Sequence, residues 1–100
     1  LDWKNNDTFW LATVRASPGE PKAHNTLATV YVSHREYTKA IFELRTAIQL
    51  KPTYVPAYYN LGLVYEMMND KAQALEYYRK AKELIPNDID VIKAVQRLSQ

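Results

Sequence analysis

The sequence predicts an all-α fold, built as a solenoid of antiparallel helix pairs with about six helices. Prolines recur every 34 residues, at Pro18, Pro52 and Pro86, and a fixed period of this size is typical of stacked repeats. Apolar residues recur at intervals of three and four, as at Leu61 and Tyr65, which is the spacing of one helix face. Strand-like alternation is not sustained anywhere in the sequence.

The repeat is visible residue by residue when residues 21–54 are laid over residues 55–88. Nine of the 34 pairs are identical, where chance at average composition gives roughly two. Apart from one arginine pair the matches are mostly small or apolar, as a packing constraint requires. The identical pairs are Ala23/Ala57, Leu27/Leu61, Val30/Val64, Tyr31/Tyr65, Ala40/Ala74, Arg45/Arg79, Ala47/Ala81, Leu50/Leu84 and Pro52/Pro86.

Helix punctuation sets the expected elements. Pro21 and Pro56 suit first turns, where a missing N–H has no cost, and the residue before each periodic proline is pushed out of the α region. Asp70 suits an N-cap, as does Asn87 or Asp88. The expected helices lie near residues 7–16, 21–34, 37–50, 55–68, 71–84 and 88–98. Because the links between them are short, consecutive helices are expected to be antiparallel neighbours.

Small residues recur at equivalent positions of the expected helix pairs. Ala28 and Gly62 fall on the first helix of each pair, and the identical alanine pairs 40/74 and 47/81 fall on the second. A small side chain lets two helix axes approach closely while a large neighbour fills the remaining space. The expected large partners are Tyr31, Tyr58, Tyr65, Leu44 and Tyr78.

These residues carry a resemblance to a known family. The run Tyr58-Tyr59-Asn60-Leu61-Gly62-Leu63-Val64-Tyr65, followed by Ala74, Tyr78, Ala81 and Pro86, resembles the tetratricopeptide repeat signature. Residues 21–54 match less fully, since His24, Ala28 and Leu44 replace an aromatic, a glycine and an aromatic. The resemblance implies one domain, a right-handed superhelix over residues 1–100. Its expected parts are a half repeat (1–20), two repeats (21–54 and 55–88) and a capping helix (89–100).

Composition excludes several function classes. The net charge is +2, with acids and bases interspersed, so no nucleic-acid partner is expected. No run of 18 apolar residues is present, so no direct membrane insertion is expected. The start of the chain lacks initiator Met and signal-peptide features, and we expect a mature product or an excised piece of a longer chain. The absence of cysteine leaves both a cytoplasmic and an extracytoplasmic soluble domain open.

No active site is expected, and neither is a metal or cofactor. His24 and His34 are ten residues apart, whereas a zinc pair on one helix needs a spacing of four. His24 is interpreted as a half-buried packing residue and His34 as a helix-end residue. No glycine-rich phosphate loop, nucleophile elbow or HExxH motif is present.

A binding groove is the favoured functional interpretation, with a protein or peptide as partner. By resemblance, the first helix of each pair lines the concave face. The candidate groove residues are Asn25, Thr29, Val32, Ser33, Tyr59, Leu63, Glu66, Met67, Lys93 and Arg97. Tyr59, Leu63 and Met67 form one stripe at intervals of four. Asn25, Lys93 and Arg97 are expected at the edge of this stripe, which therefore suits a peptide with acidic character. Simple packing is the competing explanation for the stripe.

One sub-family is disfavoured by particular residues. Repeats that clamp a chaperone's C-terminal carboxylate resemble this chain at Asn60. Where that sub-family has its other carboxylate-binding residues, this chain has Asn25, Thr29, Asp90 and Ala94. Without the clamp's cations, the resemblance does not extend to chaperone co-factor activity.

Two alternatives remain open. The apolar residues Trp3, Phe9 and Trp10 lie on a half repeat, so the chain is a candidate self-assembly module, a homo-oligomer through that end. The chain also loosely resembles the start of the repeat tail that follows the membrane domain in some polytopic, glycosyltransferase-like proteins. The residues that carry this resemblance are Trp3, Asp7, Trp10, Ser17-Pro18 and His24-Asn25. That resemblance implies an extracytoplasmic tail of a larger protein.

Overall fold

The computed structural model describes residues 14–100, and regular structure in this part of the chain is helical, without a strand. The helices are α2 (Pro21–Ser33), α3 (Tyr37–Leu50), α4 (Val55–Met67), α5 (Lys71–Leu84) and α6 (Ile89–Leu98). Each bound lies within one residue of the expected one. Of the expected helix at 7–16, only residues 14–16 are described, and they are helical. The predicted all-α class is confirmed.

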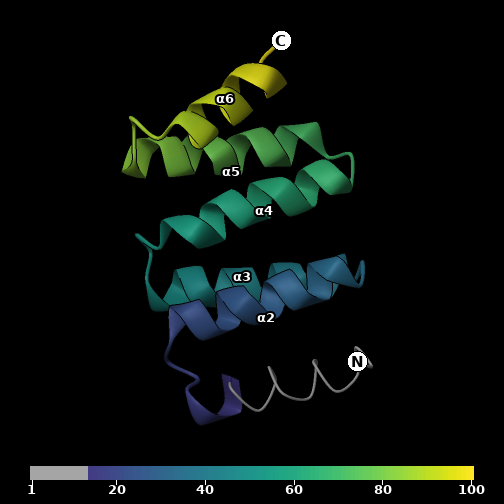
Figure 1. Cartoon of the computed structure of the whole chain (residues 1–100), viewed down its shortest axis with the longest axis vertical. Helices are drawn as coiled ribbons and strands as arrows, with labels where there is room; N and C mark the ends of the chain where they lie inside the picture. The colour runs from purple at the N-terminus through teal and green to yellow at the C-terminus, as the bar shows by residue number, and fades with distance from the viewer. Residues whose placement is uncertain (1–13) are drawn as a thin grey trace. The chain divides into compact units, whose positions relative to one another are not determined.

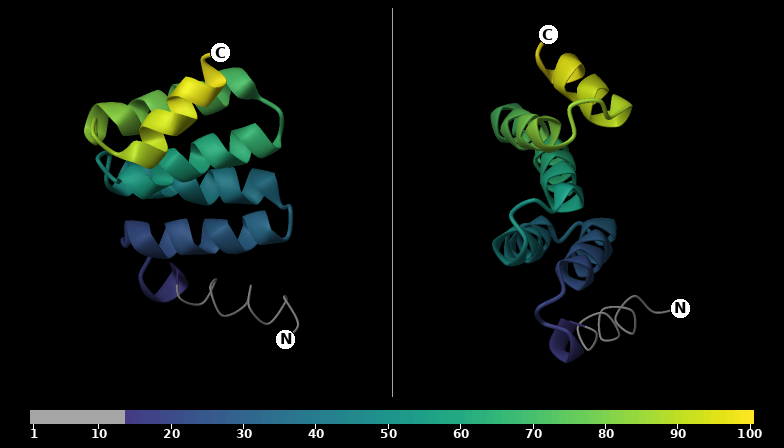
Figure 2. Two further views of the ribbon diagram at one scale, coloured as in Figure 1. Left: turned by 45° about the horizontal axis from the view of Figure 1, so that its top comes forward. Right: turned by 90° about the vertical axis from the view of Figure 1, so that its left-hand side faces the viewer.

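Contacts divide the chain into two compact units, with the boundary between Tyr54 and Val55. In the first unit α2 packs against α3, and in the second α5 packs against both α4 and α6. Consecutive helices run in opposite directions within each unit (Figure 1; Figure 2). Each unit therefore has the antiparallel helix pair that the short links predict.

The small residues expected at the helix seams are buried. In α2 and α3 the buried apolar residues are Leu27, Ala28, Ala40, Leu44 and Ala47; in the second unit they are Ala57, Leu61, Val64, Tyr65, Ala74, Tyr78, Ala81, Val91 and Ala94. Alanine thus fills the tight positions of both pairs, and Leu or Tyr fills the wide ones. The expected small residues and three of the expected large partners, Leu44, Tyr65 and Tyr78, are therefore buried, whereas Tyr31 and Tyr58 are only half-buried.

Gly62 and Tyr78 show how close the contact between α4 and α5 is. A Cβ atom placed on Gly62 would lie 2.5 Å from Cε1 and 2.6 Å from Cδ1 of the Tyr78 ring. Tyr78 is fully buried, so the ring has little room to move away. In the other unit, Ala28 occupies the position equivalent to Gly62, and Leu44 occupies the position equivalent to Tyr78. Alanine is larger than glycine, and leucine is smaller than tyrosine.

Helices α2 and α4 end in turns of the same type. Arg35 and Asn69 adopt φ of 60° and 62°, the left-handed region. At the end of α2, the Glu36 N–H donates to Tyr31 O (2.9 Å) and the Arg35 N–H to Val32 O (2.9 Å). These are the paired bonds of a Schellman motif, and Asp70 and Asn69 repeat them after α4. The chain therefore reverses direction twice without glycine.

Side-chain caps begin two of the helices. The Asp70 carboxylate accepts a hydrogen bond from the Gln73 N–H (3.1 Å), and the Asp88 carboxylate accepts one from the Val91 N–H (3.1 Å). Each bond satisfies a backbone donor that the first turn leaves without a partner. Both caps are as predicted, with Asp88 rather than Asn87 at the start of α6.

Candidate functional site

The apolar stripe predicted on α4 is partly packed and partly open. Tyr59 and Leu63 are half-buried, and Met67 is 51 % exposed. The Tyr59 ring lies against Tyr78 of α5, with the ring centroids 5.5 Å apart and the planes tilted by 54°. One end of the stripe therefore stabilises the helix pair, while Met67 leaves apolar surface in contact with solvent.

Glu66 joins the three helices of the second unit. Nη2 of Arg97 donates to both carboxylate oxygens of Glu66, at 2.7 and 2.9 Å, and the Tyr78 hydroxyl donates to Oε1 at 2.8 Å. Burial, and then the hydrogen bond and negative charge of Glu66, raise the pKa of Tyr78 above its ordinary value. The hydrogen bond that Arg97 donates to Glu66 likewise raises the pKa of Arg97. The structure thus brings two candidate groove residues together as an ion pair whose charges largely cancel.

Lys93 is the remaining candidate groove residue of the second unit. Lys93 is exposed on α6, and none of the ion pairs found among residues 14–100 includes it. Arg97 is committed to Glu66, so Lys93 is the candidate cation that stays available to a ligand. The sequence predicts two cations beside the α4 stripe, Lys93 and Arg97, and the ion pair with Glu66 leaves one of them, Lys93, for a ligand.

The first unit carries the other candidates along α2. Thr29 and Ser33 are exposed, and their hydroxyls donate to carbonyls one turn earlier, Thr26 O (2.7 Å) and Val30 O (2.6 Å). Asn25 and Val32 are half-buried. These residues belong to a different unit from α4 and α6. The candidates for self-association, Trp3, Phe9 and Trp10, lie outside the described residues.

A shallow pocket at the start of α4 and α6 was not predicted. Its volume is about 190 Å³, and its wall combines apolar side chains with two carboxylates and one tyrosine ring. The lining residues are Val55, Pro56, Tyr59, Ile85, Asp88, Asp90 and Val91. Sequence reasoning assigned Asp88 only to helix capping, because nothing in the spacing shows that Val55 and Asp90, 35 residues apart, share a wall.

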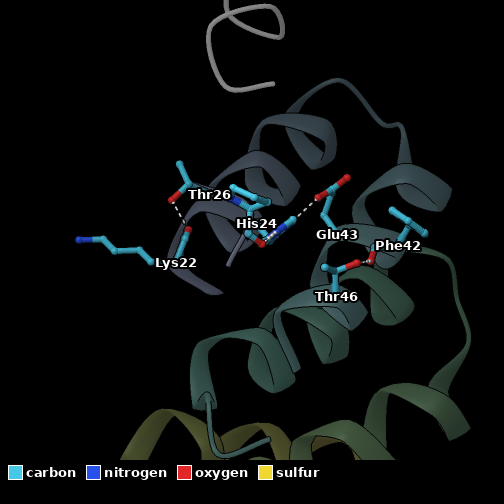
Figure 3. A network of polar contacts seen from close by, with 7 residues as sticks. Lys22, His24, Thr26, Phe42, Glu43 and Thr46 are labelled. Atoms are coloured by element: carbon cyan, nitrogen blue, oxygen red, sulfur yellow. Dashed lines mark hydrogen bonds and ion pairs between the residues drawn. The ribbon is translucent and has the colours of Figure 1, made fainter. Parts of the chain in front are cut away.

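His24 is more deeply buried than its predicted packing role required. It is 6 % exposed, and its ring bridges two segments (Figure 3): Nδ1 lies 2.8 Å from Glu43 Oε1 of α3, and Nε2 lies 2.9 Å from the Pro18 carbonyl oxygen. The carboxylate oxygen and the carbonyl oxygen thus lie on opposite sides of the ring, each within hydrogen-bond distance of one ring nitrogen. The residue ties α2, α3 and the preceding loop together, a structural role.

The described part of the chain shows neither a metal-binding cluster nor a candidate membrane span. Among residues 14–100, no group of three or more histidine, cysteine or acidic side chains could hold a metal ion. None of the helices described is long and apolar enough to cross a membrane.

Comparison with protein families gives two matches. Residues 55–88 match the family described as tetratricopeptide repeat, and residues 28–69 match the family described as TPR repeat. Among curated proteins, Hsp70-Hsp90 organizing protein 2 of Arabidopsis thaliana is 26 % identical over 91 residues. Protein O-mannosyl-transferase TMTC3 of Homo sapiens is 24 % identical over 98 residues.

The chain is much shorter than these curated relatives. It spans 16 % of the organizing protein and 11 % of the O-mannosyl-transferase, while 91 % and 98 % of this chain are covered. Each similarity therefore concerns one part of a longer relative.

Solved structures show the same fold. The crystal structure of MamA superposes with a TM-score of 0.88 at 27 % identity, covering 96 % of this chain and 56 % of that one. The first TPR of Spaghetti (RPAP3), solved with the HSP90 peptide SRMEEVD, gives 0.89 at 20 % identity, covering 98 % and 78 %.

Proposed function

Because the chain belongs to the tetratricopeptide repeat family, we propose that it is a non-catalytic scaffold that binds a peptide or protein segment along the first helices of its repeats. Such helix-pair solenoids display extended surfaces suited to binding rather than to chemistry. In this chain the proposed surface includes the α4 stripe, Tyr59, Leu63 and Met67, together with α6.

The exposed end of the α4 stripe is the observation that carries the proposal. Met67 is 51 % exposed, although it continues a stripe in which Tyr59 lies against Tyr78 of α5 and Leu63 is half-buried. An apolar stripe of this spacing is the kind of surface that receives a peptide or an amphipathic helix. The name of the Arabidopsis relative, which organises Hsp70 and Hsp90, supports a protein partner in general terms.

The sequence-based alternative of a larger, glycosyltransferase-like protein is compatible with this proposal. Similarity to O-mannosyl-transferases covers 83 to 98 % of the chain, and a repeat module within such a protein would still act by binding. Self-association through Trp3, Phe9 and Trp10 stays a prediction.

The test uses peptides selected by the chain itself. A phage-displayed library of random twelve-residue peptides is selected on the immobilised chain, and the enriched peptides are synthesised with a fluorophore. We expect the double variant Tyr59→Ala/Leu63→Ala to weaken their binding about tenfold or more, because buried anchor side chains dominate such interfaces. The measurement is fluorescence anisotropy, with helicity checked by circular dichroism.

Phe42→Ala is the matched control. Phe42 is 68 % exposed and lies on α3, so its removal deletes apolar surface from another helix. Peptides whose affinity is unchanged by the α4 double variant would exclude this face as the binding site.

A further inference from the structure

The pocket at the start of α4 and α6 has a composition that points to one kind of occupant. Pro56, Tyr59, Val55 and Val91 give it apolar walls, while Asp88 and Asp90 supply two negative charges. Long basic side chains combine these needs, because they lay an apolar stem along an apolar surface and keep a charged head in contact with water or an acid.

The two carboxylates of this pocket form no ion pair within the described part of the chain. The ion pairs among residues 14–100 are Lys39 with Glu36 and Arg97 with Glu66, and the one further contact of this kind joins His24 to Glu43. Neither carboxylate of the pocket takes part in them. Lys93, three residues after Asp90 on α6, forms no ion pair with it.

Helix capping explains part of this arrangement but not the pocket. Asp88 accepts the Val91 N–H, and Asp90 lies in the first turn of α6, where an acid interacts favourably with the helix dipole. Neither role requires an apolar hollow of about 190 Å³ that also includes Pro56 and Tyr59 of α4.

We propose that this pocket binds one lysine or arginine side chain of the peptide, so that the preferred ligand carries a basic residue beside apolar ones. This rests on the proposed function and specifies its ligand. The stem lies on Pro56 and Val55, the cation faces Asp88 and Asp90, and the Tyr59 ring offers a further favourable contact for the cation. The acidic ligand that the sequence suggested loses support, because Arg97 is already paired with Glu66.

The test returns to the selected peptides. We expect them to be enriched in lysine and arginine relative to the input library. Replacing the basic residue by norleucine, which keeps an apolar stem, lowers affinity for the unmodified chain about tenfold, because a paired charge is lost. The same replacement has little effect on the double variant Asp88→Asn/Asp90→Asn. Asparagine caps a helix about as well as aspartate does, so this variant removes charge while keeping the start of α6.

Glu76→Gln/Glu83→Gln, which removes two charges from the exposed face of α5, is the matched control, and it should respond to norleucine as the unmodified chain does. Peptides that depend on Tyr59 and Leu63 but tolerate norleucine would overturn this inference and leave the proposed function standing. If no selected peptide depends on Tyr59 and Leu63, the proposed function fails and the inference fails with it.

Discussion

The contact between Gly62 and Tyr78 leaves no room for a larger side chain at position 62. A methyl group on Gly62 would approach three ring carbons at 2.5 to 2.9 Å, and the ring is held by burial and by its hydrogen bond to Glu66. The first unit has Ala28 and Leu44 at the same two positions. The sizes of the paired residues compensate. The larger small residue, Ala28, is paired with the smaller Leu44, whereas Gly62 is paired with the larger Tyr78.

Gly62→Ala should lower the free energy of unfolding by about 1–3 kcal/mol, as overpacking a well-filled core does. Adding Tyr78→Leu to that variant recreates the alanine and leucine of the first unit. We expect Tyr78→Leu to lower the free energy of unfolding less in the Gly62→Ala variant than in the unmodified chain, where the smaller side chain would leave a cavity. Urea denaturation of the four chains measures this coupling. Strictly additive losses would show that the two positions are not in steric contact.

At the scale of elements, the turns after α2 and α4 place a residue other than glycine in the left-handed region. Arg35 and Asn69 lie 34 residues apart and have nearly equal φ values. Asparagine tolerates this conformation because its short polar side chain bonds locally, whereas arginine has no such compensation. The same turn therefore carries different strain in the two units.

Arg35→Gly should raise the free energy of unfolding by about 1 kcal/mol, and Asn69→Gly by less, because glycine removes the Cβ clash of the left-handed region. Arg35→Ala is the control, since it removes the long side chain but keeps Cβ, and it should give no comparable gain. Thermal and urea unfolding measure the three variants. Equal effects of alanine and glycine at position 35 would contradict backbone strain as the cause.

The element scale is also where sequence reasoning reached its limit. The 34-residue period and the spacing of Leu61 and Tyr65 predict helix ends and buried faces, because both follow from local geometry and composition. The bonds of Glu66 to Arg97, 31 residues away, and of His24 to Glu43, 19 residues away, depend on side-chain positions across helices. Periodicity reports which face is buried, and it carries no information on such pairs.

At the scale of the whole molecule, the two units repeat one packing scheme at matching positions. Ala47 and Ala81 are both fully buried, each on the second helix of its pair. Gln49 and Glu83, two residues further along, are exposed in both units. The repeat therefore provides its own internal comparison, in which a buried and an exposed position are each present twice.

Ala47→Leu and Ala81→Leu should each lower the free energy of unfolding by about 1–3 kcal/mol, because the added methyl groups have no free volume at the seam. Gln49→Leu and Glu83→Leu place the same side chain on exposed positions, where changes usually stay within about 0.5 kcal/mol. Urea unfolding midpoints of the four variants compare the units directly. A large loss at position 47 together with tolerance at position 81 would mean that the two repeats, although alike in sequence, do not pack in the same way.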